Sequence, residues 1–157
     1  MCKTRIIFLA LLMVLSLSLT GCGKKEVLMD VPADDGNYHY SNADLGFSLV
    51  LPKEFQYYQT QRKNNSDYTD LEFFVPSSDT GYAQEVPSYA KPVTIRIVTI
   101  KMWDAADNIF DKTLAKEIGR KGDTVFSIIF WNTVPKDWRE KWSSEMEKAI
   151  INNFKML

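Results

Sequence analysis

The chain has 157 residues and a formal net charge of −1, with 19 basic and 20 acidic side chains. This balance argues against a nucleic-acid-binding protein, which needs basic side chains concentrated on one face. The length suits one globular domain with one hydrophobic core.

Residues 1–21 have the composition of a secretory signal peptide. Lys3 and Arg5 precede an almost unbroken apolar run over residues 6–19, and a basic start followed by an apolar run of about 7–15 residues is typical of such signals. The run is shorter than the roughly 20 residues that a transmembrane helix needs. Because the basic residues come before the run, the rest of the chain is expected to cross the membrane.

The apolar run closes with Leu19-Thr20-Gly21-Cys22, which resembles the lipobox of bacterial lipoproteins. The resemblance implies cleavage between Gly21 and Cys22 and attachment of a diacylglyceryl group to the Cys22 thiol. An ordinary secretory signal with an incidental cysteine is the alternative. We expect a lipoprotein anchored through acylated Cys22 in membrane lipid, on the extracytoplasmic face of a bacterial membrane in the cell envelope.

Cysteine chemistry is not expected in the mature chain. Cys2 leaves with the signal and lipid occupies the Cys22 sulfur, so no thiol remains for a disulfide, a metal or a nucleophile. Residues 22–37 are small, charged or turn-forming and predict a flexible tether, which spans roughly 20 Å for about 15 residues. Lys24 and Lys25 either contact anionic lipid, at about 1 kcal/mol each, or only keep the tether soluble.

The globular domain is predicted to occupy residues 38–157. Phe47, Leu49 and Leu51 recur at every second position, which is the period of a half-buried strand, and further strands are predicted over 55–62 and 70–75. The β-branched run over 93–100 is the clearest strand. The nearly continuous apolar run over 124–131 is typical of a strand covered on both faces.

Helices and loops are predicted between and after these strands. Residues 77–92 form a long irregular segment, followed by a short helix over 103–110, a helical turn over 113–118 and a polar turn over 119–123. The last element is an amphipathic helix that begins at Pro135 and clamps the sheet with one apolar stripe. The stripe consists of Trp138, Trp142, Met146, Ala149, Ile150 and Phe154.

Both ends of the domain resemble a PsbP-like (Mog1/PsbP-like) domain. The stretch Tyr40–Pro52 is similar to the first hairpin of that family, and Ile151-Asn152-Asn153-Phe154-Lys155 is similar to its close. The resemblance implies a single α+β domain, an antiparallel β-sheet flanked by helices on both faces (α-β-α). The sequence departs from the pattern at Asn153, where a smaller residue is common. The matching residues are structural and imply no catalytic set.

Few residues have the pattern of a chemical site. His39 is the only histidine, which excludes a site built on several histidines. Asp104, Asp107 and Asp111 would share one helical face, either as calcium ligands or as a solvated acidic face. The second reading is favoured, because the D-x-D-x-D-G pattern of a calcium loop is missing.

The segment from Gly119 to Gly122, with its two basic residues, is either an anion cradle or a turn. A turn is favoured because the longer glycine pattern of a phosphate loop is missing. The serines lack a G-x-S-x-G setting, which disfavours serine-type hydrolysis.

Three aromatic residues, Tyr82, Tyr89 and Trp103, are candidates for contact with a partner, because aromatic side chains on loops often anchor one. Burial beneath the loop is the alternative. The preferred hypothesis is a non-enzymatic interaction or accessory module with a protein partner in the cell envelope, no cofactor, no metal and no nucleic acid. The alternatives are a cell-envelope hydrolase with carboxylates of raised pKa, and a small-ligand-binding lipoprotein with an enclosed aromatic pocket.

Overall fold

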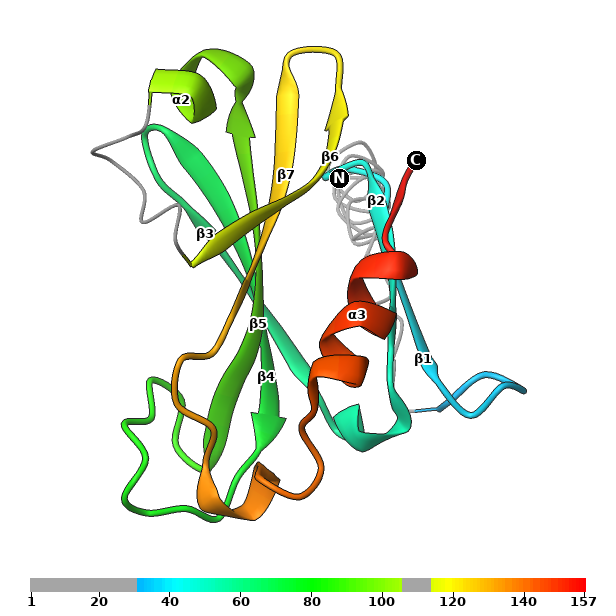
Figure 1. Ribbon diagram of the computed structural model, residues 1–157, viewed down its shortest axis with the longest axis vertical. Helices are drawn as coiled ribbons and strands as arrows, with labels where there is room; N and C mark the ends of the chain where they lie inside the picture. The colour runs from blue at the N-terminus through cyan, green and yellow to red at the C-terminus, as the bar shows by residue number, and fades with distance from the viewer. Residues whose placement is uncertain (1–30, 106–113) are drawn as a thin grey trace, which may run out of the picture.

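The computed structural model describes residues 31–105 and 114–157. Within these residues, two antiparallel sheets lie against each other, one with the strand order β1-β2-β8 and one with the order β3-β4-β5-β7-β6 (Figure 1). The strands are β1 (Tyr38–Asn42), β2 (Phe47–Leu51), β3 (Gln59–Asn64), β4 (Tyr68–Pro76), β5 (Tyr89–Thr99), β6 (Ala115–Lys121), β7 (Thr124–Phe130) and β8 (Lys155–Met156). The helices are α2 (Ile100–Ala105) and α3 (Ser144–Asn152), with short 3-10 helices η1 (Lys53–Phe55) and η2 (Lys136–Trp138).

The main hydrophobic core lies between the five-stranded sheet and the layer formed by the three-stranded sheet and α3 (Figure 1). Leu71, Ile95 and Ile128 lie side by side on β4, β5 and β7 and are almost fully buried. The ring centroids of Tyr40 and Phe73 lie 5.1 Å apart and join the two layers. Such a ring pair stabilises the fold by about 0.5–1.5 kcal/mol beyond the burial of its area.

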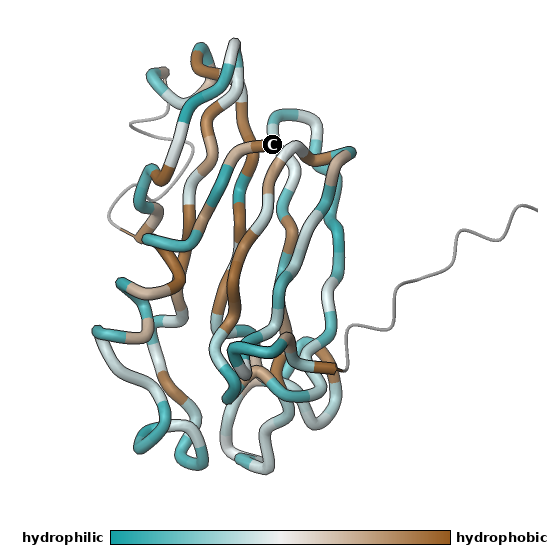
Figure 2. The backbone as a smooth tube through the Cα atoms, turned by 90° about the vertical axis from the view of Figure 1, so that its right-hand side faces the viewer, coloured by the Kyte–Doolittle hydropathy of each residue, from teal (hydrophilic) through white to brown (hydrophobic). Residues whose placement is uncertain are grey.

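The outer face of the five-stranded sheet, which is turned away from the main core, carries polar side chains at buried positions. Asp70, Arg96 and Ser127 lie side by side across β4, β5 and β7. Further along this face, Val98 and Val125 pack with Trp103 of α2 in a second, smaller apolar cluster. Figure 2 shows that hydrophobic residues concentrate along the strands and hydrophilic residues in most of the connecting loops.

The mixed α/β architecture with antiparallel sheets agrees with the predicted class, and the strands predicted over 93–100 and 124–131 are confirmed as β5 and β7. The strand predicted over 55–62 begins only at Gln59, because η1 comes first. The short helix predicted over 103–110 begins at Ile100 as α2, and its later part lies outside the described residues.

The helical turn predicted over 113–118 was wrong, and the polar turn predicted over 119–123 was too long, because β6 occupies Ala115–Lys121. This strand pairs with β7 along its length, and such pairing depends on cross-strand packing more than on local propensity. The hairpin turn is confined to the two residues after β6, where Gly122 has a left-handed φ of 58°. Only glycine adopts that conformation at little cost.

The long C-terminal helix beginning at Pro135 was also wrong. The helix α3 starts after Ser143, whose hydroxyl accepts a hydrogen bond from the Met146 backbone N–H at 3.2 Å and caps the first turn. Trp138 belongs to η2, and Phe154 follows the helix. The apolar clamp is therefore assembled from three short segments. None of the described helices has the length and apolar composition needed to cross a membrane.

Candidate functional site

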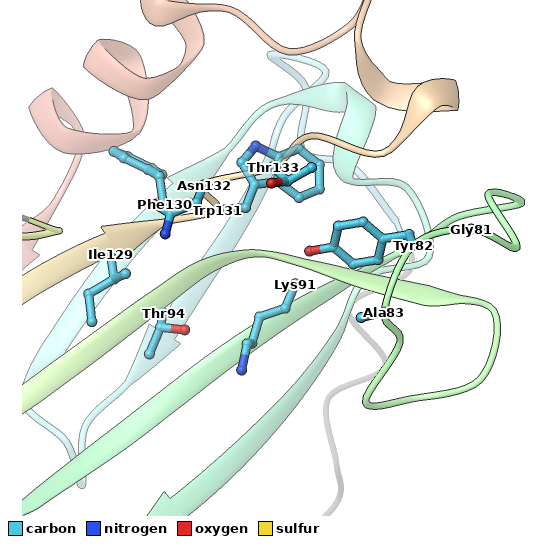
Figure 3. A pocket seen from close by; sticks show the side chains of 10 residues that line it. All are labelled: Gly81, Tyr82, Ala83, Lys91, Thr94, Ile129, Phe130, Trp131, Asn132 and Thr133. Atoms are coloured by element: carbon cyan, nitrogen blue, oxygen red, sulfur yellow. The ribbon is translucent and has the colours of Figure 1, made fainter.

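A pocket of about 430 Å³ lies over the outer face of the five-stranded sheet, where β5 begins and β7 ends (Figure 3). Its floor is formed by Thr94 and Ile129, which are cross-strand partners on β5 and β7. One wall is the segment over residues 77–88, which we call the Tyr82 loop, and the other is the segment that begins at Trp131. The sheet thus supplies a rigid base, and two connecting loops supply the sides.

The start of the Tyr82 loop is fastened to η2. Asp137 accepts hydrogen bonds from the Ser77 hydroxyl at 3.0 Å and from the Ser78 backbone N–H at 2.8 Å. In return, the Lys136 backbone N–H donates to Asp79 at 2.9 Å. Burial raises the pKa of Asp137, but the hydrogen bonds from Ser78 and Ser77 outweigh it and hold that pKa below its ordinary value.

The end of the loop is held by a charge cluster of four residues, Lys63, Glu72, Glu85 and Lys91. Glu72 lies 2.8 Å from both lysine Nζ atoms, and its side chain is only 5% exposed. Glu85, on the loop, lies 2.7 Å from Lys63 Nζ and also pairs with Lys91. The cluster contains two positive and two negative charges and is therefore neutral as a unit.

Hydrogen bonds within the cluster shift the pKa values of its members. The hydrogen bonds that Lys63 donates to Glu72 and Glu85 raise its pKa. Burial opposes the ammonium form of Lys91, yet hydrogen bonds to the same two glutamates leave its pKa above the ordinary value. The pKa of Glu85 is lowered, first by its hydrogen bond from Lys63 and then by that from Lys91. All three groups therefore stay charged at neutral pH.

Two hydroxyl groups reach into the pocket. Figure 3 shows the Tyr82 hydroxyl pointing into it from the loop and the Thr94 hydroxyl pointing into it from the floor. Partial burial raises the pKa of Tyr82, so the phenol stays protonated. Within the described part of the chain, neither hydroxyl has a hydrogen-bond partner.

The opposite wall is aromatic. The Trp131 ring packs against Trp138 and Trp142, with centroid distances of 5.7 and 4.7 Å. Its indole N–H is buried and has no hydrogen-bond partner among the described residues. A buried donor without a partner is rare in folded proteins and needs a reason.

The three aromatic candidates from the sequence have different positions. Tyr82 lines the pocket. Tyr89 is the first residue of β5, and its hydroxyl accepts a hydrogen bond from Gln59 Nε2 at 3.0 Å. Trp103 lies on α2, at the other end of β5, with its side chain buried in the second apolar cluster. Tyr82 therefore lies in the Tyr82 loop and Tyr89 directly follows that loop, whereas Trp103 lies away from both.

Trp131, Lys91 and Thr94 also line the pocket, although none of them was predicted as a site residue from the sequence. Trp131 could have been predicted from its position, because it is an aromatic residue at the end of an apolar strand and directly precedes polar residues. Lys91 and Thr94 carried no comparable signal, because the side of the sheet that they face depends on the register of β5 with β4 and β7.

The other candidates that fall within the described residues do not line the pocket. His39 is exposed on β1, with Nε2 2.9 Å from Asp35 Oδ2. Asp104 lies 3.6 Å from Arg120 Nη2, while Gly21, Cys22, Asp107 and Asp111 lie outside the described residues. Gly119 is part of β6, which corrects the turn expected from Gly119 to Gly122.

The pocket offers a ligand apolar contact and several hydrogen bonds. Across residues 31–105 and 114–157, no three histidine, cysteine or acidic side chains lie close enough together to hold a metal ion. Comparison of the whole chain with protein-family models, with curated proteins and with solved structures finds no match.

Proposed function

We propose that the protein is a lipid-anchored, non-enzymatic binding module of the bacterial cell envelope, and that the pocket beside Tyr82 is its recognition site. The observation that carries the proposal is the charge cluster at the edge of the pocket. Glu72 and Glu85 each pair with Lys63 and Lys91. Carboxylates that are each paired with two lysines fix the position of the Tyr82 loop, and they are poorly suited to exchange protons with a substrate.

A hydrolase that uses carboxylates is less well supported. A general acid at neutral pH needs a carboxyl group with a raised pKa. Near the pocket, hydrogen bonds from Lys136 N–H and Gly81 N–H lower the pKa of Asp79, and the pKa values of Glu85 and Asp137 are lowered as well. These groups are ionised at neutral pH and have no proton to donate.

The position of the expected tether supports recognition near the membrane. β1 starts at Tyr38, whose ring lies 5.8 Å from that of Tyr58. Phe55, three residues earlier, packs on Trp138, which in turn packs on Trp131 of the pocket wall. The chain therefore enters the domain at the end that carries the pocket, and a flexible tether of about 15 residues would keep that end at a root-mean-square distance of roughly 20 Å from the lipid.

The proposal includes a PsbP-like domain. Two observations support it: β1 and β2 form an antiparallel hairpin within the stretch that resembles the opening of the family, and the two helices pack in different places. Met146 and Ile150 of α3 pack in the main core, and Trp103 of α2 packs in the cluster on the outer face. This placement is compatible with an α-β-α arrangement.

A small-ligand-binding function is the second candidate, and the pocket itself favours it. A volume of about 430 Å³ with aromatic side chains in its walls falls in the range of 300–1,000 Å³ that is usual for ligand pockets. The protein partner expected from the sequence stays a prediction, and the same experiment tests both kinds of occupant.

The experiment is photocrosslinking in the native membrane. A photoreactive phenylalanine replaces Tyr82 in the full chain, and a matched protein carries it in place of Asp67, which is exposed in the turn between β3 and β4 at the far end of the sheet. We expect position 82 to capture an envelope component that position 67 does not capture, and a Cys22→Ser variant to lose the adduct and the membrane fraction. Recovery of lipid alone from position 82, or an intact mass with unmodified Cys22, would contradict the proposal.

A further inference from the structure

The chemistry of the pocket restricts the class of ligand that fits it, and charge is the first restriction. Lys91 is the cationic side chain among the pocket-lining residues, and it is already engaged by Glu72 and Glu85. An anionic ligand would approach a lysine whose charge two carboxylates already compensate, and a cationic ligand would meet the lysine itself. Because the charge cluster is neutral as a unit, it attracts neither an anion nor a cation, and an uncharged ligand is favoured.

Unsatisfied hydrogen-bonding groups give the second restriction. The Tyr82 hydroxyl points into the pocket from the loop and the Thr94 hydroxyl from the floor (Figure 3), and Asn132 and Thr133 add an amide and a hydroxyl to its lining. Hydroxyl and amide groups both donate and accept. A ligand that fills the pocket without such groups would remove water from them and leave them unpaired, at about 1–3 kcal/mol for each group.

Shape and apolar surface give the third restriction. Ile129 supplies an apolar floor next to Thr94, while the Tyr82 ring and the Trp131 ring form the sides. A ligand therefore needs an apolar face to lie against these groups and polar groups around its rim. A pyranose ring has this arrangement, since its axial C–H bonds form an apolar face and its hydroxyls project at the edge.

We propose that the Tyr82 pocket binds an uncharged saccharide unit, either free or as part of a larger glycan. The inference rests on the proposed binding function and assigns the ligand class to the same site. An aliphatic chain would leave the hydroxyls unpaired. An aromatic side chain of a protein partner would fill the apolar space but satisfy few of the polar groups.

The test is saturation-transfer NMR on the full lipidated protein in lipid nanodiscs, with empty nanodiscs as the blank. The probes are cellobiose and N,N′-diacetylchitobiose, both uncharged, at millimolar concentration, compared with decanoate and N-acetyl-phenylalaninamide. We expect transfer to the ring C–H protons of at least one disaccharide. Tyr82→Phe should weaken binding about five-fold, the equivalent of one neutral hydrogen bond, and Tyr82→Ala should abolish it.

Tyr89→Phe is the matched control, because it removes the same hydroxyl from a tyrosine at the base of the loop that does not line the pocket. It should leave saccharide binding unchanged. Equal transfer to the disaccharides in wild type and Tyr82→Ala, or no transfer at all, overturns the inference, as does Tyr82-dependent binding of decanoate or the phenylalanine amide alone. A failure to bind saccharide would not change the crosslinking result, which tests the binding function. An unlipidated Cys22 would contradict the lipid anchor but would not change saccharide binding, so the two proposals can fail separately.

Discussion

Asp137 Oδ2 accepts two hydrogen bonds from Ser78, one from its backbone N–H at 2.8 Å and one from its hydroxyl at 3.2 Å. The two residues are 59 positions apart in the chain. Their contact joins η2, which packs in the aromatic core through Trp138, to the start of the Tyr82 loop. The loop that forms one wall of the pocket is thereby attached to the part of the core that forms the other.

The first prediction concerns this attachment. Asp137→Asn keeps one acceptor oxygen but puts an NH₂ group where the other accepts, so at least one hydrogen bond to a charged acceptor is lost. We expect a loss of about 1–2 kcal/mol in the free energy of unfolding, measured by urea denaturation, and faster amide exchange in residues 78–82. Asp34→Asn, at an exposed position before β1, is the control and should change neither quantity. Unchanged exchange at Ser78 in Asp137→Asn would show that the contact does not hold the loop.

The second prediction compares two Arg–carboxylate pairs on the same sheet. Arg96 donates from Nε and Nη2 to Asp70 at 2.8 Å each, and the two side chains are 15% and 9% exposed. Arg120 makes the same two-pronged contact to Glu117, but those side chains are 41% and 35% exposed.

Removing one member of a buried ion pair leaves an uncompensated charge inside the protein. Removing one member of an exposed pair costs less, because solvent screens the charge that remains. We expect Asp70→Asn to destabilise the fold by about 2–4 kcal/mol and Glu117→Gln by less than about 1 kcal/mol, both measured by chemical denaturation. Asp70→Leu combined with Arg96→Met should recover part of the loss, because no buried charge remains. Similar losses for the two single variants would contradict the difference in burial.

The third prediction is a pH dependence of the loop. The pKa of Glu85 lies below the ordinary value of 4.5 because Lys63 and Lys91 donate hydrogen bonds to it. A carboxyl group whose pKa is lower in the folded than in the unfolded state stabilises the fold above its unfolded pKa. That stabilisation is lost as the pH falls through the lower, folded pKa.

We therefore expect the ¹³C carboxyl resonance of Glu85 to titrate with a midpoint below 4.5. Lys63→Gln removes the larger cause and should move the midpoint upward, while Lys116→Gln, at an exposed position on β6, should not. A midpoint at or above the ordinary value in the wild type would contradict the ion pairs that hold the end of the loop.

The fourth prediction concerns Gly119, where the C-terminal strand crosses close to β6. A Cβ atom at this position would lie 3.1 Å from Met156 Sδ and 3.4 Å from Phe154 Cε1. Gly119→Ala requires only a small shift of the flexible Met156 side chain and should be nearly neutral. Gly119→Val should destabilise the fold by about 1–3 kcal/mol through overpacking, as measured by thermal and urea unfolding. Met156→Ala should restore part of the stability in the Val background but not in the wild type, and failure to do so would place the clash elsewhere.

Part of this fold could be predicted from local patterns because those patterns reflect burial directly. The alternation in β2 buries one side chain in two, and the same period appears in the sequence. The β-branched run of β5 buries consecutive residues on both faces of the sheet, which a run of apolar residues also indicates. β6 had no such pattern, since only Ala115 among its residues is fully buried. It is a strand because β7 offers a free edge to pair with, and that partner is not visible in the residues of β6 themselves.

The pocket could be predicted only in part. An irregular segment with Tyr82 and Tyr89 was visible in the sequence, but its partner across the pocket, Trp131, lies about 50 residues further along. The contact between the two segments depends on Asp137, whose two acceptor oxygens meet Ser77 and Ser78 only in the folded chain. Local composition gives no information on such a pairing.

The sequence by itself determined the strands whose apolar residues alternate or form a continuous run. It also predicts a lipobox, because that prediction depends only on a short contiguous motif ending at Cys22. The tertiary structure decided which residues form a site. It set the register that turns Lys91 and Thr94 to the outer face, buried Trp103 away from the pocket, and divided the C-terminal helix at Ser143. These outcomes depend on contacts between distant segments, and the energy of such contacts exists only once the chain has folded.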